Sequence, residues 1–331
     1  MMNMLFTVDN RMMPFTSMAR KPSSSKSERS GIPNSQIGTY FAKVYGGFKP
    51  GGVADGKDVG AFDSQPVREG ISFRPEKYRR APMVGELLEG DDIAGVNSEW
   101  MEAIADQTIM HKRDMEKEFL SDQDSSANGG AEGGTTGRGL GRWINNTAQA
   151  GGLSYSELPV PQGAQTPAAQ IFIGSIGDGV TTGLTEDVIS TLLQSRWDLT
   201  GDSSKLVGLL GAALKNRFSF FSKYKANVAN ATVIVRTNTD DFTSGELNGA
   251  AVDVYQSDWG TFSLLPVSTI FLPDQYRGYF IDSEHVEIRS RYWMREKSLP
   301  DLGGGPRELI ESFVALIPGD LRSHVKIAGA A

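Results

Sequence analysis

The clearest pattern in the chain is a run of apolar positions at helical spacing across residues 97–120. The residues at three- to four-residue steps along one face are Trp100, Ile104, Thr108, His111, Met115 and Phe119. Asn97 or Ser98 can cap the first turn, and neither glycine nor proline interrupts the segment. At about 1.5 Å per residue, the sequence predicts a helix roughly 35 Å long with one polar face, which is far longer than average.

Residues 1–30 lack the pattern of a globular segment. Apolar side chains occur in residues 1–6 and 12–18, and the polar sequence PSSSKSERSG follows. An apolar arm of this kind is ordered only where it lies on other structure. Two alternatives are open: the arm lies on its own domain, or it contacts a neighbouring subunit. The candidate residues for a contact between subunits are Met12, Pro14, Phe15 and Met18.

Residues 31–95 predict a long two-stranded excursion. Strand-like runs at 37–45 and 67–77 flank a glycine-rich tip, and nine glycines fall between Gly31 and Gly70. Aromatic and charged residues alternate, and there are too few apolar residues for an independent core. Because an isolated hairpin is marginally stable in water, we expect this one to rest on another chain. The candidate contact residues are Tyr40, Phe41, Tyr45, Phe48, Arg68, Arg74, Arg79 and Arg80.

The remainder of the chain predicts a mixed α+β body interrupted by irregular segments. A glycine-rich loop spans residues 121–141, and helices at 186–196, capped by Thr185, and at 203–224 form a predicted helical hairpin. Strand patterns follow at residues 231–237, 251–257, 261–273 and 278–293. The last segment, 307–330, has strand character on either side of a Pro-Gly-Asp turn.

Composition narrows the class of protein. The 331 residues include 38 glycines, well above the usual share of about 7%, so much of the chain is loop or extended arm. The net charge of −7 argues against specific DNA binding, because proteins that grip phosphates are normally basic. There is no cysteine, no apolar run long enough to span a membrane and no signal-peptide pattern, which predicts a soluble cytoplasmic protein.

The sequence offers no set of residues suited to catalysis. The three histidines lie far apart without metal-ligand spacing, and each is expected to serve packing or hydrogen bonding. The sequence GSIGDG at 174–179 lacks the third glycine and the following helix of a phosphate-binding loop. Neither GxSxG nor HExxH occurs. We therefore expect a protein that is not an enzyme and has no cofactor and no metal.

Short motifs at six places, with the order of the segments, resemble those of a known family. They are MPFTSM at 13–18, HKRDME at 111–116, RGLGRWI at 138–144, SDWG at 257–260, FLP at 271–273 and SHV at 323–325. Together they resemble the major capsid proteins of tailed bacteriophages with the Hong Kong 97-type fold, and most closely a subfamily of phage major head proteins. The resemblance covers nearly the whole chain, and none of the motifs is catalytic.

The resemblance implies an α+β fold with an N-terminal arm, an extended β-hairpin loop, a long spine helix, and peripheral and axial domains. The expected parts are an arm at 1–30, the extended loop and its return strand at 31–95, a peripheral domain at 96–180 with the spine helix at 97–120, an axial domain at 181–290, and C-terminal strands at 291–331 that return to the peripheral domain.

The implied function is self-assembly, as hexamers and pentamers, into the icosahedral head that encloses phage double-stranded DNA. The implied partners are further copies of the chain, with scaffolding, portal and decoration proteins in addition, non-specific contact with packaged DNA, and no membrane. The expected place is the virion, assembled in the cytoplasm of the host bacterium. Two alternatives are open: a bacterial nanocompartment shell protein, and a loop-rich monomeric carbohydrate-binding or hydrolase domain.

Overall fold

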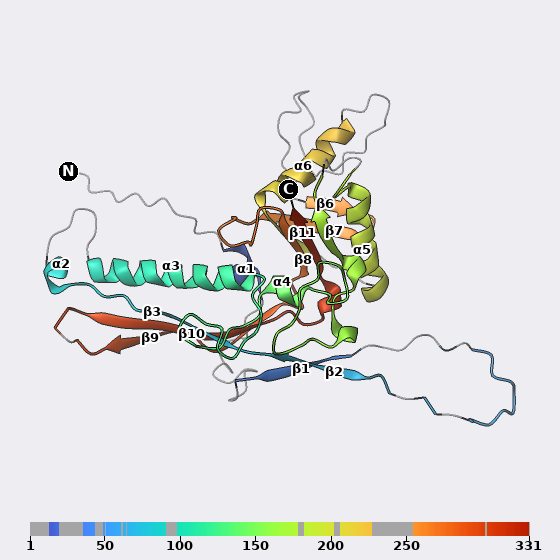
Figure 1. The fold of residues 1–331 in the computed structure, drawn as a ribbon, viewed down its shortest axis with the longest axis horizontal. Coiled ribbons are helices and arrows are strands. Elements are labelled where there is room, and N and C mark those ends of the chain that lie inside the picture. The colour runs from blue at the N-terminus through green and yellow to red at the C-terminus, as the bar shows by residue number, and fades with distance from the viewer. Residues whose placement is uncertain are drawn as a thin grey trace.

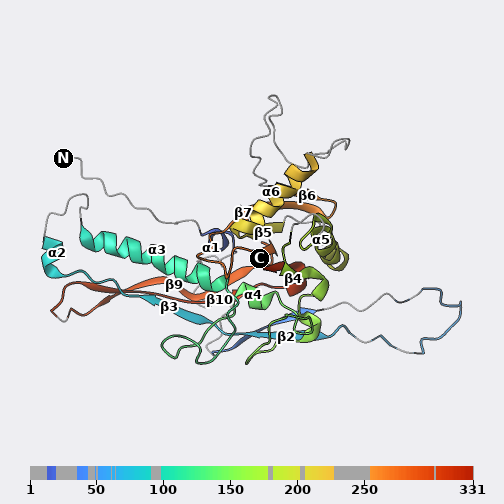
Figure 2. The same cartoon turned by 45° about the horizontal axis from the view of Figure 1, so that its top comes forward.

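A computed structural model provides the structure of the chain. The residues that it describes are 13–19, 36–43, 49, 51–60, 62–63, 65–90, 98–177, 182–201, 206–226, 254–301 and 303–330. The predicted contact residues Met12, Tyr45 and Phe48 and the predicted strand at 231–237 lie outside this part of the chain. In the described part, a long helix and extended strands project from one compact body (Figures 1 and 2).

The long helix predicted from the sequence is present as α3, Glu99–Phe119. The Ser98 side chain caps it by accepting a hydrogen bond from the Met101 amide, and acidic residues occupy its first turn. Burial is concentrated in its C-terminal half, where His111, Met115 and Phe119 are buried. Ile104, on the predicted apolar face, is only partly buried, so the N-terminal half of the helix is less covered than the periodicity suggests.

A three-stranded antiparallel sheet lies along α3 (Figure 1). Its strands, in spatial order, are β3 (Glu76–Arg80), β10 (Arg307–Ile317) and β9 (Glu287–Leu299). Tyr78 packs edge-on against His111 with ring centroids 6.3 Å apart, and the Ser312 hydroxyl lies 2.9 Å from His111 Nε2. The helix and the sheet therefore share one packed face. The short helix α2 (Glu86–Gly90) lies near the N-terminal end of α3 (Figure 1).

The predicted hairpin is confirmed as the antiparallel pair of β1 (Gly38–Lys43) and β2 (Arg68–Phe73). Gly38 lies opposite Phe73, and a Cβ atom at Gly38 would stand 2.3 Å from the Phe73 ring, so only glycine fits there. Residues 51–60, in the connection between the two strands, extend beyond the body of the molecule (Figure 1) and are exposed throughout.

A six-stranded mixed sheet forms the second layer of the body. Its spatial order is β4 (Ile171–Ser175), β11 (Val325–Ala330), β8 (Arg277–Asp282), β5 (Leu206–Leu210), β7 (Gly260–Pro266) and β6 (Val254–Ser257). The helices α5 (Glu186–Thr200) and α6 (Ala212–Ala226) pack on it through one hydrophobic cluster. The short helices are α1 (Pro14–Met18), α4 (Leu140–Trp143), η2 (Gln162–Ala164), η3 (Ala168–Gln170) and η4 (Leu321–Ser323).

The predicted helical hairpin is wrong in its second half. The Thr185 cap and the first helix are present, but residues 206–210 form the buried strand β5, and the next helix begins only at Ala212. A short apolar run that is buried on both faces has no period that separates strand from helix. Gly208 marks the strand, because a Cβ atom there would lie 2.9 Å from Leu264 on the neighbouring strand.

The two strands around the Pro-Gly-Asp turn belong to different sheets. β10 lies at the centre of the three-stranded sheet, whereas β11 pairs with β8 and β4 in the six-stranded sheet. The turn at residues 318–320 therefore passes the chain from one sheet to the other, and each sheet receives one strand of the C-terminal segment.

Candidate functional site

Four of the six motifs, far apart in sequence, meet in one part of the structure. A first hydrophobic cluster, separate from the one that joins α5 and α6 to the six-stranded sheet, contains residues of four of the six motifs, namely Phe15, Met115, Leu140, Trp143, Ile144, Phe271 and Leu272. This cluster lies where α1, the C-terminal end of α3 and α4 come together (Figure 1). The side chains of these motifs therefore pack together and connect the arm, the long helix and the base of the hairpin.

The described part of the arm is held by a buried carboxylate on α3. Glu116 is fully buried and accepts hydrogen bonds from the amides of Phe15, at 2.8 Å, and Thr16, at 2.7 Å, and from the Thr16 hydroxyl. The Phe15 ring packs edge-on against Phe119 with centroids 6.1 Å apart. Of the two alternatives for the arm, residues 13–19 thus follow the one in which the segment lies on its own chain.

This placement changes the interpretation of the predicted arm contacts. Phe15 has no exposed surface in the protomer, so the structure assigns it to the protomer core instead of a surface that faces a neighbour. Pro14 and Met18 are partly buried and keep some exposed surface.

The base of the hairpin also belongs to the protomer core. Ala42, Ile71 and Phe73 are buried in the first cluster. Tyr40 packs against Phe73 and Trp143, each with ring centroids 6.4 Å apart, and burial raises the pKa of its phenol. The expectation that the whole excursion has no core of its own is therefore wrong for its base, and Tyr40 faces inward.

The opposite face of the hairpin is exposed. Phe41 is 70% exposed and stands across from Gly70 in the strand register. Arg68 is exposed beside it, opposite Lys43. Beyond the strands, Val53, Val59 and Phe62 are 77%, 73% and 92% exposed. We call the set Phe41, Arg68, Val53, Val59 and Phe62 the outer hairpin surface.

Three of the four arginines predicted to reach a neighbour have partners within the chain. Arg80 binds Asp114 of α3 through two hydrogen bonds of 2.7 and 2.8 Å. Arg74 pairs with Glu157 at 2.8 Å, and Arg79 pairs with Glu132. These contacts tie the returning strand to α3 and to the loops after it, which leaves Arg68 as the arginine of this set on the outer hairpin surface.

The motif at 138–144 anchors the loop that follows α3. The Arg138 guanidinium lies between the rings of Trp143 and Tyr155, at 4.7 and 4.5 Å from their centroids, and donates to Asp124 at 2.9 Å. Burial alone would raise the pKa of Asp124, but the Ser156 amide and the Arg138 guanidinium outweigh it and hold the pKa below its ordinary value. The loop is thus fixed by a buried charge pair and two aromatic rings.

Two acidic residues of the three-stranded sheet, the buried Glu311 and the half-buried Glu76, were not foreseen. Glu311 of β10 is ion-paired with Lys77 at 2.7 Å, Lys297 at 2.8 Å and Arg295 at 2.6 Å. Burial acts to raise its pKa, yet the three cations lower it to about 2. Glu76 of β3 is the opposite case, because burial and the neighbouring Glu118 raise its pKa to about 8. Since their partners come from distant segments, no local pattern identifies either one.

The histidines serve hydrogen bonding, as the sequence indicates, where they are buried. His324, in the SHV motif, accepts from the Asp282 amide through Nδ1 at 3.2 Å and donates from Nε2 to the Pro318 carbonyl at 2.8 Å. Burial lowers its pKa to about 4. In the described ranges, no group of three or more histidine or acidic residues could hold a metal ion.

Acid should weaken the protein through His324. The unfolded chain binds a proton at this residue near pH 6.5, whereas the folded chain binds it only near pH 4, so stability is lost as pH falls through that window. Between pH 7 and pH 5 the expected loss is about 2 kcal/mol in the free energy of unfolding. Urea unfolding of wild type and His324→Gln at both values measures it, and equal pH dependence in the two proteins would contradict it.

A family model supplies the first comparison with known proteins. The model of the SU10 major capsid protein matches residues 79–330. A search of curated protein sequences finds no match to this chain. The match begins within β3 and covers α3, the strands β9 and β10, the six-stranded sheet and every motif from 111 onward.

Solved structures supply the second comparison. The cyanophage A-1(L) capsid asymmetric unit is similar with a TM-score of 0.62 and 15% identity, covering 98% of this chain and 94% of that one. The capsid of a native GTA particle is similar with a TM-score of 0.56 and 12% identity, covering 99% of this chain and 93% of that one. The structure from Mycobacterium phage Che8 has a TM-score of 0.53 and 12% identity, covering 99% of this chain and 96% of that one. These matches confirm the predicted α+β fold of the Hong Kong 97 type over the whole chain.

Proposed function

We propose, from the premise that this chain belongs to the SU10 major capsid protein family, that its copies join as hexamers and pentamers into the icosahedral head of a tailed phage. Membership of the family makes it a capsid-forming structural protein of the virion, with a role that is not enzymatic. We further propose that the head encloses double-stranded DNA. The paragraphs below propose how copies of the chain contact one another.

The outer hairpin surface is the observation that carries this proposal. The hairpin is anchored by its inner face, yet its other face and the residues 51–60 beyond it carry exposed apolar side chains. Large apolar side chains that stay exposed along one projecting segment are candidates for contact with another chain. A projecting two-stranded hairpin also gains stability when it lies on another surface. We therefore place the hairpin across the adjacent subunit of the same capsomer, with Phe41 and Arg68 in the contact.

The two larger sheets supply the proposed domains. The three-stranded sheet with the spine helix α3 forms the peripheral domain, and the six-stranded sheet with α5 and α6 forms the axial domain near the symmetry axis of the capsomer. The strands β4 and β11, which the bounds drawn from the sequence put with the peripheral domain, lie in the six-stranded sheet. The net charge of −7 suits a container that contacts packaged DNA only non-specifically. Scaffolding, portal and decoration proteins are further proposed partners, and assembly takes place in the host cytoplasm.

The two alternatives drawn from the sequence are not favoured. A family model of a phage capsid protein that covers residues 79–330 favours a viral head over a nanocompartment shell. It equally disfavours a monomeric carbohydrate-binding or hydrolase domain.

No helix in the described ranges is both long and apolar enough to cross a membrane.

Native mass spectrometry and negative-stain electron microscopy of the purified protein test the proposal. We expect capsomer masses of six or five chains and closed particles of uniform diameter. A protein that stays monomeric and forms no particle, alone or with the scaffolding protein of its phage, would contradict the proposal.

A further inference from the structure

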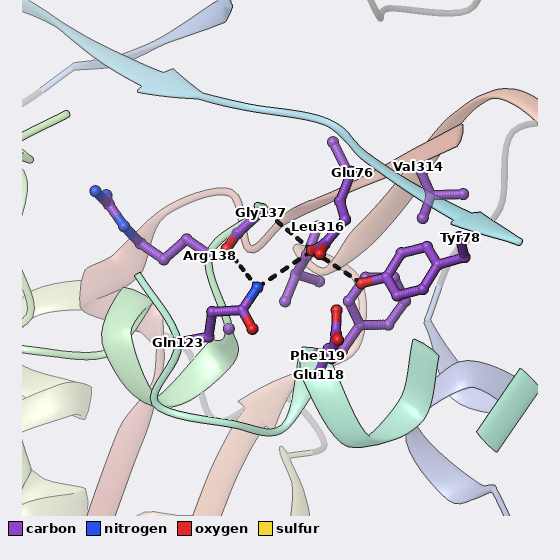
Figure 3. Close-up of a pocket in the computed structure, with 11 residues that line it drawn as sticks. Glu76, Tyr78, Glu118, Phe119, Gln123, Gly137, Arg138, Val314 and Leu316 are labelled. Atoms are coloured by element: carbon purple, nitrogen blue, oxygen red, sulfur yellow. Dashed lines mark hydrogen bonds between the residues drawn. The ribbon is translucent and has the colours of Figure 1, made fainter. Parts of the chain in front are cut away.

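Two carboxyl groups line one small cavity at the junction between the hairpin and the spine helix. Glu76 begins β3, directly after the hairpin strand β2 has passed through Arg74 and Pro75, and Glu118 belongs to the last turn of α3 (Figure 3). The cavity holds about 10 Å³, which is room for at most one water molecule. Both groups therefore border the same small space, which holds little solvent to screen their charges.

The two carboxyl groups have unequal partners. Glu76 Oε2 accepts from the Gly137 amide at 2.9 Å, the Tyr78 hydroxyl at 3.1 Å and Gln123 Nε2 at 3.3 Å. The Oε2 atom of Glu118 is buried and has no hydrogen-bond partner among the described residues. A buried carboxylate oxygen without a donor is costly, whereas a protonated carboxyl group can donate to its neighbour.

Among the described residues, the lining of the cavity supplies no cation that compensates the pair. Among the described residues that line the cavity, the one cation is Arg138, and its guanidinium points away from both carboxyl groups (Figure 3) toward Asp124 and the Leu158 carbonyl. The β10 residues on the remaining wall are Val314, Ala315 and Leu316. Tyr78 stays neutral, because burial raises the pKa of its phenol.

Electrostatics disfavours two negative charges in this position. Like charges at short range in a poorly solvated site repel strongly, and one of two neighbouring carboxyl groups then keeps its proton. The carbonyl groups at the C-terminal end of α3 add further negative potential. Consistent with this, burial and Glu118 together raise the pKa of Glu76 to about 8.

We propose that Glu76 and Glu118 share one proton near neutral pH, and that this proton holds the base of the hairpin against the C-terminal end of the spine helix. When the proton leaves, two like charges face each other where β2 continues into β3. Among the contacts that remain across the joint are the Arg74–Glu157 pair, the bond from the Thr135 hydroxyl to the Pro75 carbonyl and the Arg80–Asp114 pair further along β3, so the joint loosens without coming apart. The consequence for the shell, a hairpin that is stiff at neutral pH and looser in alkali, rests on the proposed function.

The test uses unassembled protomers in the presence of a chelator, so that no divalent cation replaces the proton. Urea unfolding of wild type, Glu76→Gln and Glu118→Gln is recorded between pH 6.5 and 9. The folded state of wild type holds a proton that the unfolded chain lacks, so its stability falls as pH rises toward the pKa of about 8. Relative to Glu76→Gln, we expect the ratio of folded to unfolded wild type to fall by up to about tenfold per pH unit.

Glu118→Gln separates a shared proton from a merely buried Glu76. Without the second charge, Glu76 ionises at lower pH, although burial still raises its pKa, so the fall in stability should end at a lower pH than in wild type. Glu132→Gln changes an exposed carboxyl group of the adjoining loop and should follow wild type. A wild-type profile parallel to that of Glu76→Gln would overturn the proposal, and so would a Glu118→Gln profile that still follows wild type.

Hydrogen exchange in wild type alone gives a second readout that needs no variant. After correction for intrinsic rates, amides of residues 74–80 and 135–139 should exchange faster at pH 9 than at pH 7, and unchanged protection would overturn the proposal. Both measurements concern protomers, so their result stands apart from the proposed function. A failure to form shells at any pH would refute assembly and leave the shared proton intact.

Discussion

Shortening the tip of the hairpin is expected to abolish closed shells while the protomer stays folded. The change replaces residues 51–60 by a short Gly-Ser turn. All ten positions are exposed, so their removal takes no side chain from either hydrophobic cluster. Long exposed loops can be shortened at little cost to the folded state. The shortened hairpin no longer reaches the neighbouring subunit, and assembly is lost for that reason.

Circular dichroism and thermal unfolding check the protomer, and negative-stain microscopy counts particles under conditions in which wild type assembles. A control that keeps all ten residues but carries Val53→Ser and Val59→Ser separates length from apolar contact. Normal particles from the shortened protein would refute the role in assembly. An unfolded shortened protein would instead assign the tip to the protomer core.

Replacing Glu116 by alanine is expected to produce the largest loss of protomer stability, about 4 kcal/mol. The substitution leaves the buried amides of Phe15 and Thr16 without their acceptor and removes a side chain that is fully buried. Hydrogen bonds to a charged group contribute about 1.5–3 kcal/mol each, and buried donors left unpaired add their desolvation cost. Urea unfolding at pH 7 measures the change in free energy of unfolding.

The matched control is Asp106→Ala, an exposed acidic position on the same helix, for which we expect a change within about 0.5 kcal/mol. Hydrogen exchange at Phe15 and Thr16 adds a local readout, since both amides should lose protection in Glu116→Ala. If stability and exchange both matched wild type, the carboxylate would not be what holds the arm.

The elements that the sequence predicts well are those with a local cause. The spine helix has a cap at Ser98, a helical period that is sustained over many residues, and no glycine or proline to interrupt it. The hairpin has two strand patterns around a glycine-rich tip. The helix predicted at residues 206–210 was wrong because a buried central strand has no polar positions that reveal its period. The close approach of Gly208 to Leu264, which identifies the strand, lies between two strands and leaves no local pattern. Where the secondary structure of a segment depends on a neighbouring strand, its local sequence pattern does not predict it.

The site illustrates the same limit at longer range. Phe15 and Glu116 are 101 positions apart, so the sequence left open whether the arm lies on its own domain or on a neighbour, and the acceptor on its own spine helix decides this for residues 13–19. Arg80 and Arg74 were likewise assigned to a partner chain, while Asp114 and Glu157 stand within reach in the fold. Which residues are left for contact between subunits emerges only after such internal pairs are known.

The central claim is that the outer hairpin surface, exposed in the protomer, is covered by an adjacent copy in the shell. Hydrogen exchange of assembled shells and of dissociated protomers measures this directly in peptides that span residues 38–43 and 51–60. Peptides from the C-terminal half of α3, already buried in the protomer, serve as the internal reference. We predict that exchange in the hairpin peptides slows by about tenfold or more on assembly while the reference is unchanged. Equal exchange of the hairpin peptides in shells and protomers would contradict the account.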